Sequence, residues 1–155
     1  MLGRSDSMNF VTSCHQVESC VLDAPVGSVW EALRTLDFSK YTPASVKSTK
    51  FTSGSSNEVG SVFTVEYTDG STWTFRVVEI SESRRTLSYE LLSAEPETTF
   101  SSLQVTLRLY KVTENDSTFV TWESDYSNDV NTHVLQDGKY KKLDAFKELK
   151  KAFSK

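Results

Sequence analysis

Six segments of β-type sequence follow one another between residues 46 and 126, with turn residues rather than helical sequence between them. β-Branched and aromatic residues dominate these segments, which is typical of antiparallel strands joined by short turns. Asp69-Gly70, between two aromatic segments, is the strongest hairpin signal. The predicted strands are Val46–Thr52, Ser61–Thr68, Thr72–Ile80, Thr86–Leu92, Ser102–Val112 and Thr118–Tyr126.

One strand and two short helices are expected before this run. Phe10–Leu22 is rich in Val, Thr, Ser and Cys, which favours a first strand. Pro25 suits the first turn of a following helix, where its missing N–H costs nothing. A second helical turn over Asp37–Tyr41 is expected to end before Pro43. The first helix is predicted from apolar residues at helical spacing, which are Val26, Val29, Trp30, Leu33 and Leu36.

The last segment, about Asp129 to Phe153, predicts one long helix with Asn128 or Asp129 as its N-cap. The stripe of residues predicted to face the sheet is apolar in the second half of this helix, whereas those in the first half have side chains with polar end groups. Either the helix and sheet diverge there and leave a cavity, or the first two turns extend past the sheet into water. The stripe is His133, Gln136, Tyr140, Leu143, Phe146, Leu149 and Phe153.

The lysines of this last segment are expected on its other, solvated faces. Several lie near the C-terminus, where the helix dipole favours positive charge. They are Lys139, Lys141, Lys142, Lys147, Lys150 and Lys151.

Length, composition and charge limit the class of protein. The chain has 155 residues, of which 12% are aromatic, and a net charge of −4. One domain over residues 10–155 is therefore expected, after a flexible N-terminus over residues 1–9. The acidic balance argues against nucleic acid as a partner, and no apolar run is long enough to span a membrane. The first residues lack the apolar core of a signal peptide, which favours a cytoplasmic location. A monomer or weak dimer is expected.

No metal or cofactor site is predicted. Cys14 and Cys20 fall in one predicted strand, about 20 Å apart along it, which is beyond disulfide reach. They are expected to be free thiols or partners for another chain. With two histidines in the chain, no second ligand pair joins Cys14 and His15. No nucleophile elbow, P-loop or dinucleotide fingerprint is present.

Four short motifs follow one another along the chain, namely Leu22–Leu33, Gly60–Phe63 leading to Asp69-Gly70, Arg85–Tyr89 and Val120–Trp122. In order and spacing they resemble the START/birch-pollen-allergen (SRPBCC) superfamily, and within it the polyketide cyclase/dehydratase-like branch. The resemblance covers nearly the whole chain.

The resemblance implies an α+β helix-grip fold. In this fold a curved, seven-stranded antiparallel sheet surrounds a long C-terminal helix, with two short helices after the first strand. A sheet that closes toward a barrel encloses more volume than one helix fills, which implies an internal pocket. The superfamily's abscisic acid receptors carry gate and latch signatures that this sequence lacks at Asp69–Trp73 and Thr98–Phe100. Abscisic acid is therefore not the expected ligand.

Three functions are compatible with this interpretation. The favoured one is a carrier or sensor that binds a hydrophobic or amphipathic small molecule in the internal cavity. The alternative is a cyclase, dehydratase or isomerase acting on a polyketide-like carbonyl substrate there, with His133, Tyr140 and Arg76 as candidate catalytic residues. The second alternative is a chaperone-type protein-interaction module, which requires an interior filled by side chains.

The orientations of Trp122 and Arg76 bear most on the site. Trp122 is favoured inward, because the reverse would bury the carboxylate of Glu123 without a partner. An inward Arg76 would pair with a ligand anion or with Glu66 or Glu90, whereas an outward Arg76 would be a surface side chain.

Strand alternation predicts which other side chains face the cavity, although it leaves the inward face of residues 73–80 and 118–126 open. The resemblance adds three aromatic residues at the cavity mouth, Phe38, Tyr41 and Phe100. The complete predicted ligand-binding set is Phe38, Tyr41, Phe63, Val65, Tyr67, Arg76, Tyr89, Leu91, Phe100, Val105, Leu107, Trp122, His133, Gln136 and Tyr140.

Overall fold

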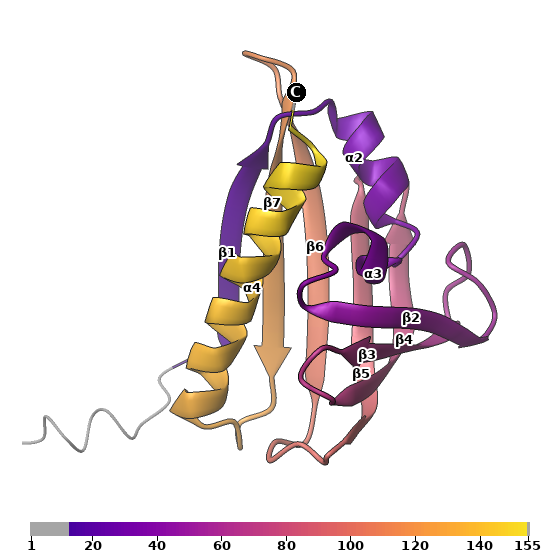
Figure 1. The fold of residues 1–155 in the computed structure, drawn as a ribbon, viewed down its shortest axis with the longest axis vertical. Coiled ribbons are helices and arrows are strands. Elements are labelled where there is room, and N and C mark those ends of the chain that lie inside the picture. The colour runs from indigo at the N-terminus through magenta and orange to yellow at the C-terminus, as the bar shows by residue number, and fades with distance from the viewer. Residues whose placement is uncertain (1–12, 155) are drawn as a thin grey trace, which may run out of the picture.

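Seven strands form one antiparallel sheet in the computed structural model, which describes residues 13–154 (Figure 1). The strands are β1 (His15–Leu22), β2 (Val46–Ser53), β3 (Val62–Tyr67), β4 (Thr72–Ser81), β5 (Thr86–Glu95), β6 (Leu103–Val112) and β7 (Ser117–Tyr126). Their order in the sheet is β1-β7-β6-β5-β4-β3-β2. From β2 to β7 each strand pairs with the next along the chain, and β1 is added beside β7. The predicted seven-stranded helix-grip arrangement is confirmed.

Two predicted regions lie wholly or partly outside the described residues. The flexible N-terminus expected over residues 1–9 lies wholly outside them. The first strand is predicted from Phe10. Residues 10–12 lie outside the described range, and β1 begins at His15, after the described residues Ser13 and Cys14.

Two short helices connect β1 to β2, as predicted. They are α2 (Val26–Leu33) and α3 (Phe38–Tyr41). α2 follows Pro25 and packs its apolar face on β6 and β7. The indole N–H of Trp30, on that face, donates to Glu82 in the turn after β4. This hydrogen bond connects α2 to the β4–β5 turn.

The long helix α4 (Thr132–Ala152) begins later than predicted and has a different cap. The side chain of Asn131 accepts a hydrogen bond from the backbone N–H of Val134 at 2.9 Å. Asp129, one of the two expected caps, instead accepts hydrogen bonds from Ser101 and Ser127. These bonds hold the pKa of the Asp129 carboxyl at about 2. Asp129 therefore joins the β5–β6 loop to the segment before α4 rather than capping the helix.

The face that α4 turns to the sheet differs from the predicted stripe in its first half. Lys142 is buried, and the line continues toward the N-terminus through Gly138 to the half-buried Val134. Tyr140 is 64% exposed and Gln136 is also exposed, so both face solvent rather than the sheet. The prediction was wrong here because glycine and lysine carry no apolar signal, although they occupy the inward positions.

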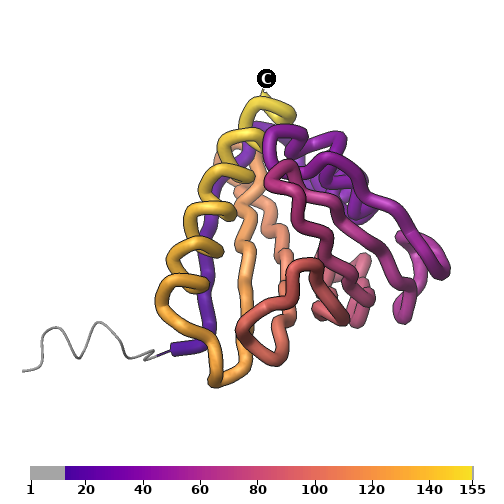
Figure 2. The backbone as a smooth tube through the Cα atoms, turned by 60° about the horizontal axis from the view of Figure 1, so that its bottom comes forward, coloured from indigo at the N-terminus to yellow at the C-terminus, as the bar shows by residue number. Residues whose placement is uncertain are grey.

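Curvature of the sheet separates its concave face from α4. Register shifts interrupt the β2–β3 and β4–β5 pairings, and such irregularities bend strands and increase their twist. Figure 2 shows the sheet curving from β1, beside α4, round to β2 on the opposite side. The core fills the end of this concavity that α2 and the last turns of α4 cover.

Aromatic rings form the centre of that core. Phe63 is fully buried, and its ring lies 5.4 Å from the rings of Phe75 and Tyr89 and 5.6 Å from that of Phe51. Such tilted, stacked and edge-to-face pairs add to the stabilisation from apolar burial. Strand alternation predicted the inward positions of β3, β5 and β6 well, since most of these side chains are buried.

None of the helices in residues 13–154 combines the length and apolar character needed to span a bilayer.

The β3–β4 hairpin turns at Asp69-Gly70, as predicted. The backbone N–H of Tyr67 donates to the carbonyl of Ser71 at 2.8 Å, and Gly70 has a φ of +93°. L-residues rarely adopt this backbone conformation, so glycine is required here for its conformational freedom.

We expect Gly70→Ala to lower the free energy of unfolding by about 1 kcal/mol, because alanine is strained at this φ. A Cβ at Gly70 would have no neighbour within 4 Å, so the effect isolates the backbone. Gly27→Ala is the matched control. Gly27 lies in α2, also without a neighbour within 4 Å, and its substitution should stabilise by roughly 0.5 kcal/mol. Urea denaturation measures both changes, and equal signs would contradict this account.

Candidate functional site

A cavity of about 590 Å³ lies between α4 and the concave face of the sheet. This volume falls within the range of small-molecule binding sites. The inner wall is largely aromatic and aliphatic, and its side chains come from α3 and from six strands, β2 to β7. Its members include Phe38, Val65, Phe75, Tyr89, Val105 and Trp122.

The cavity exists because α4 presents little side-chain volume where it faces the sheet. Gly138 and Ala145 both line the cavity, in positions where a packed helix would carry leucine or phenylalanine. Phe146, the residue after Ala145, fills the space at this end of the cavity, and its ring lies 5.9 Å from that of Trp122. The cavity therefore ends where large apolar residues resume.

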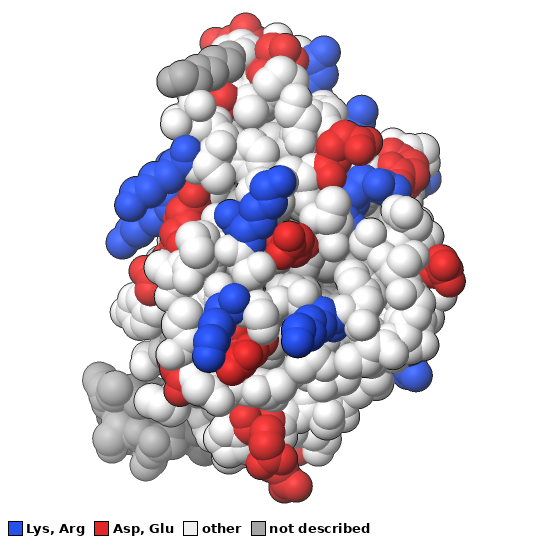
Figure 3. Space-filling model, turned by 45° about the vertical axis from the view of Figure 1, so that its right-hand side comes forward, with Lys and Arg blue, Asp and Glu red and all other residues white. Residues whose placement is uncertain are grey.

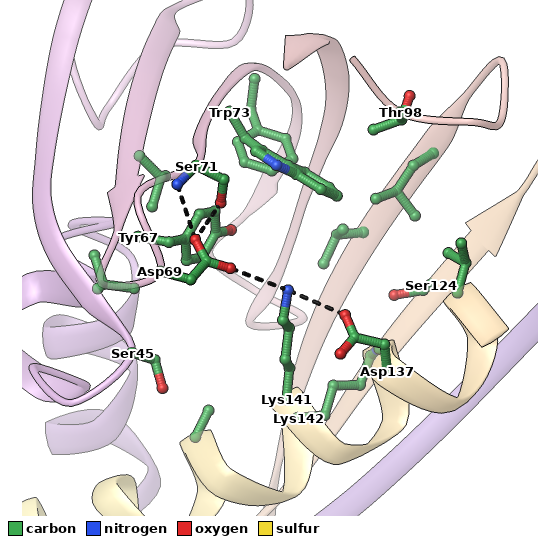
Figure 4. Close-up of a pocket in the computed structure, with 18 of the residues that line it drawn as sticks. Ser45, Tyr67, Asp69, Ser71, Trp73, Thr98, Ser124, Asp137, Lys141 and Lys142 are labelled. Carbon is green, nitrogen blue, oxygen red and sulfur yellow. Dashed lines mark hydrogen bonds and ion pairs between the residues drawn. The ribbon is translucent and has the colours of Figure 1, made fainter. Parts of the chain in front are cut away.

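Charged side chains gather at the cavity mouth. The Nζ atom of Lys141 lies 3.1 Å from the carboxylate of Asp137 and 3.9 Å from that of Asp69, which connects α4 to the β3–β4 turn (Figure 4). Two hydrogen bonds from Ser71 are the main cause that lowers the pKa of Asp69, and Lys141 contributes. All three ion-pairing side chains are more than half exposed, so solvent screens these pairs and they add little stability.

Basic and acidic side chains also alternate over the wider surface around this region. On the face seen in Figure 3, Lys and Arg are interspersed with Asp and Glu instead of forming one patch.

Among the described residues, Lys142 is the one buried lysine of α4, with 6% of its surface exposed. Its Nζ atom donates to Oε1 of Gln16 at 3.5 Å, and within residues 13–154 no carboxylate lies close enough to form an ion pair with it. Burial lowers the pKa of Lys142 to about 8, against an opposing effect of Glu18. The sequence-based expectation that Lys142 lies on a solvated face is therefore wrong.

Three polar groups surround the backbone of Gly138. A Cβ at this position would lie 2.7 Å from Oη of Tyr126, 3.2 Å from Oε1 of Gln16 and 3.8 Å from Nζ of Lys142. Gln16 is oriented by its own amide N–H, which donates to the carbonyl of Leu135 and leaves Oε1 to accept from Lys142. We call Gln16, Tyr126 and Lys142, with Gly138 between them, the polar pole of the cavity.

Eight of the predicted site residues line the cavity together, at its inner wall or its mouth. Trp122 faces inward, stacked against Phe38 with 6.2 Å between ring centroids, while Glu123 lies on the other face and pairs with Arg108 at 2.7 Å. The eight are Phe38, Val65, Tyr67, Tyr89, Phe100, Val105, Trp122 and His133.

The other predicted residues lie elsewhere. Arg76 faces outward between two inward residues and pairs with Glu90 at 2.8 Å, so the surface alternative for Arg76 is correct. Tyr41 stacks on Phe153 with ring centroids 5.6 Å apart. The remaining predicted residues that do not line the cavity are Phe63 and Leu107 in the core, Leu91, which is half-buried, and Gln136 and Tyr140 on the solvent side of α4.

Of the three catalytic candidates, His133 alone lines the cavity, where its side chain is exposed in the first turn of α4.

Sequence reasoning missed the polar pole. The spacing of Gly138, Lys142 and Ala145 was a usable signal, because steps of four and three place all of them on one helix face.

The sequence matches a known protein family, and the fold matches those of solved structures. Residues 13–146 match the family model described as "Polyketide cyclase / dehydrase and lipid transport". No curated protein matches the chain in sequence. Among solved structures, a protein from Nitrosospira multiformis has a TM-score of 0.79 at 24% identity, covering 90% of this chain and 96% of that one.

Two further solved structures have the same fold at lower identity. Major latex-like protein 151 from Panax ginseng has a TM-score of 0.73 at 16% identity, covering 92% of this chain and 100% of that one. Ara h 8.0201 has a TM-score of 0.73 at 17% identity, covering 90% and 96%. At these identities the likeness concerns the fold.

We expect Lys142→Met to raise the free energy of unfolding at pH 7, because it removes a buried charge. The pKa of Lys142 is about 8 in the folded protein, below the ordinary 10.5. Between pH 8 and pH 10.5 the unfolded chain therefore binds more protons than the folded one, so the stability of the wild type increases as the pH rises through this range. The variant's advantage should be roughly 2–3 kcal/mol below pH 8 and should shrink toward pH 10. Taking the difference between the two proteins cancels the titration of other groups.

Urea denaturation at pH 7 and pH 9.5 measures this advantage. Lys139→Met, at an exposed position of the same helix, is the control and should stay within about 0.5 kcal/mol of wild type at both pH values. A Lys142→Met variant less stable than wild type at pH 7 would show that the ammonium is not penalised by burial.

Proposed function

The chain belongs to the polyketide cyclase/dehydrase and lipid transport family, and we propose that it binds a hydrophobic or amphipathic small molecule as a carrier or sensor. The observation that carries this proposal is the cavity of about 590 Å³ between α4 and the sheet. Its inner wall is built from the side chains of aromatic and aliphatic residues, which favour an apolar guest through the hydrophobic effect.

Burial of apolar surface supplies enough free energy for such a carrier. Removing about 400 Å² of ligand surface from water yields roughly 10 kcal/mol. Association costs of about 4 kcal/mol or more leave a dissociation constant on the order of tens of micromolar. A carrier needs no tighter binding, since it must also release its ligand.

Two tyrosines give this apolar wall neutral polar groups. Burial raises the pKa of Tyr67 and of Tyr89 well above the ordinary value of 10. Both hydroxyls therefore stay protonated at neutral pH and are available as hydrogen-bond donors. A few such groups in an apolar pocket are typical of sites that orient a ligand.

The two alternatives receive less support. A cyclase, dehydratase or isomerase acting on a polyketide-like carbonyl substrate would use the same cavity, but Arg76 and Tyr140 lie outside it and His133 is exposed at its rim. A chaperone-type interaction module would need an interior filled by side chains, and the cavity is inconsistent with such an interior.

We further propose that the protein works in a reducing compartment, as cytosolic proteins do. Its two cysteines, Cys14 and Cys20, are free thiols. Free thiols persist where the cell keeps them reduced.

A substitution that fills the cavity tests the proposal. Ala145 is buried and lines the cavity, so Ala145→Phe should weaken binding of the neutral fluorescent probe N-phenyl-1-naphthylamine at least about tenfold. Ala152→Phe is the matched control, because Ala152 is exposed on the same helix. Fluorescence titration measures both affinities, with circular dichroism to verify folding.

Saturable binding by wild type and by Ala152→Phe, but not by Ala145→Phe, would support a carrier. Equal affinities in all three proteins would place the probe outside the cavity, and absence of saturable binding by wild type would overturn the proposal. Turnover of a polyketide-like carbonyl substrate would favour the enzyme instead.

A further inference from the structure

We infer that the polar pole of the cavity binds the carboxylate of an amphipathic monocarboxylic acid, whose apolar part fills the aromatic interior. Lys142 supplies the positive charge, and Tyr126 supplies a hydroxyl donor beside it. This inference rests on the proposed function, because it names the chemical class of ligand for the same cavity.

The first argument is the unbalanced charge of Lys142. The residue is 6% exposed, its ammonium has three N–H donors, and the described residues provide it with one acceptor, Gln16, at 3.5 Å. Glu18 on β1 acts on it electrostatically but is not within ion-pair distance. A buried cation without a counterion is costly, and an anion brought by the ligand would relieve that cost.

The second argument is the close approach of Tyr126 to α4 beside Lys142. Gly138 lies inside a helix of 21 residues, where glycine is a poor helix former. Its φ is not in the left-handed region, so the backbone does not require glycine. Space does require it, because a Cβ would approach Oη of Tyr126 to 2.7 Å. Gly138 thus lets the Tyr126 hydroxyl approach the backbone of α4, beside the Lys142 ammonium.

The third argument is the continuity of this point with the apolar cavity. Gly138, Tyr126 and Lys142 all line the cavity. The ring of Tyr126 packs edge-to-face on Phe100, another lining residue, with 5.1 Å between centroids. A ligand with its polar end at Gly138 would therefore extend its apolar part directly along the aromatic wall.

Charge and geometry favour a single carboxylate. The other lysine at the cavity, Lys141, is already paired with Asp137 and Asp69, so Lys142 offers the one positive charge that no carboxylate of the described part of the chain compensates. A dianion would leave a negative charge facing Asp137 and Asp69. A carboxylate has two oxygens, which can accept from the Lys142 ammonium and the Tyr126 hydroxyl together. Burial also raises the pKa of Tyr126, which keeps that hydroxyl protonated.

Two ligands of equal chain length test the inference, decanoate and decan-1-ol, each measured by displacement of N-phenyl-1-naphthylamine at pH 7. Wild type should bind decanoate at least about tenfold more tightly than decan-1-ol. Lys142→Met keeps the side-chain length and removes the charge, so it should abolish this preference by weakening decanoate binding. Lys139→Met, exposed and outside the cavity lining, should keep the preference.

Gly138→Ala provides a second, uncharged test of the same point. Its Cβ would clash with the Tyr126 hydroxyl and displace that donor from its place beside Lys142, so the preference for decanoate over decan-1-ol should fall. This variant also tests the geometry without altering the charge.

The outcomes separate this inference from the proposed function. Three results would each overturn the carboxylate site: equal wild-type affinities for decanoate and decan-1-ol, failure of both to displace a bound probe, or a decanoate preference that survives Lys142→Met. In any of these cases, a saturable probe site that Ala145→Phe blocks would still support the proposed carrier. Failure of wild type to bind the probe or either ligand would overturn both.

Discussion

One helix must cover the concave face of a curved seven-stranded sheet, and its side chains do not supply enough volume to fill that space. Where α4 carries Phe146 and Leu149, the helix and sheet pack into a closed core. Where it carries Gly138 and Ala145, a cavity remains. Core and cavity are thus consecutive parts of one interface, and the size of the helix residues decides which forms.

The features that make the site useful are unfavourable for stability. A glycine inside α4 lowers helix propensity, a lysine in the interior carries a desolvation cost, and the cavity forgoes packing contacts. The aromatic cluster around Phe63, the tie between Trp30 and Glu82 and the continuous sheet offset these costs. A site that weakens its own fold in this manner gains stability when a ligand occupies it.

Much of the fold could be predicted because its elements have simple periodicities. Strand alternation correctly placed Phe63, Val65 and Tyr89 inward, and the Asp-Gly pair located the β3–β4 turn. The helix cap was harder, because Asn128, Asp129 and Asn131 all suit a cap by residue type. Asp129 is engaged by serines of a distant loop, a contact that no local pattern contains.

The order of strands and helices, the alternation within each strand and the apolar second half of α4 all follow from the chain's local pattern, because each depends on neighbours along the chain. The cavity and its polar pole do not. Gln16, Tyr126 and Lys142 are distant in sequence, and they meet because β1, β7 and α4 pack against one another. Burial turns Lys142 from an ordinary surface-type residue into an interior charge with no ion-pair partner among residues 13–154, and burial is a property of the packed molecule alone.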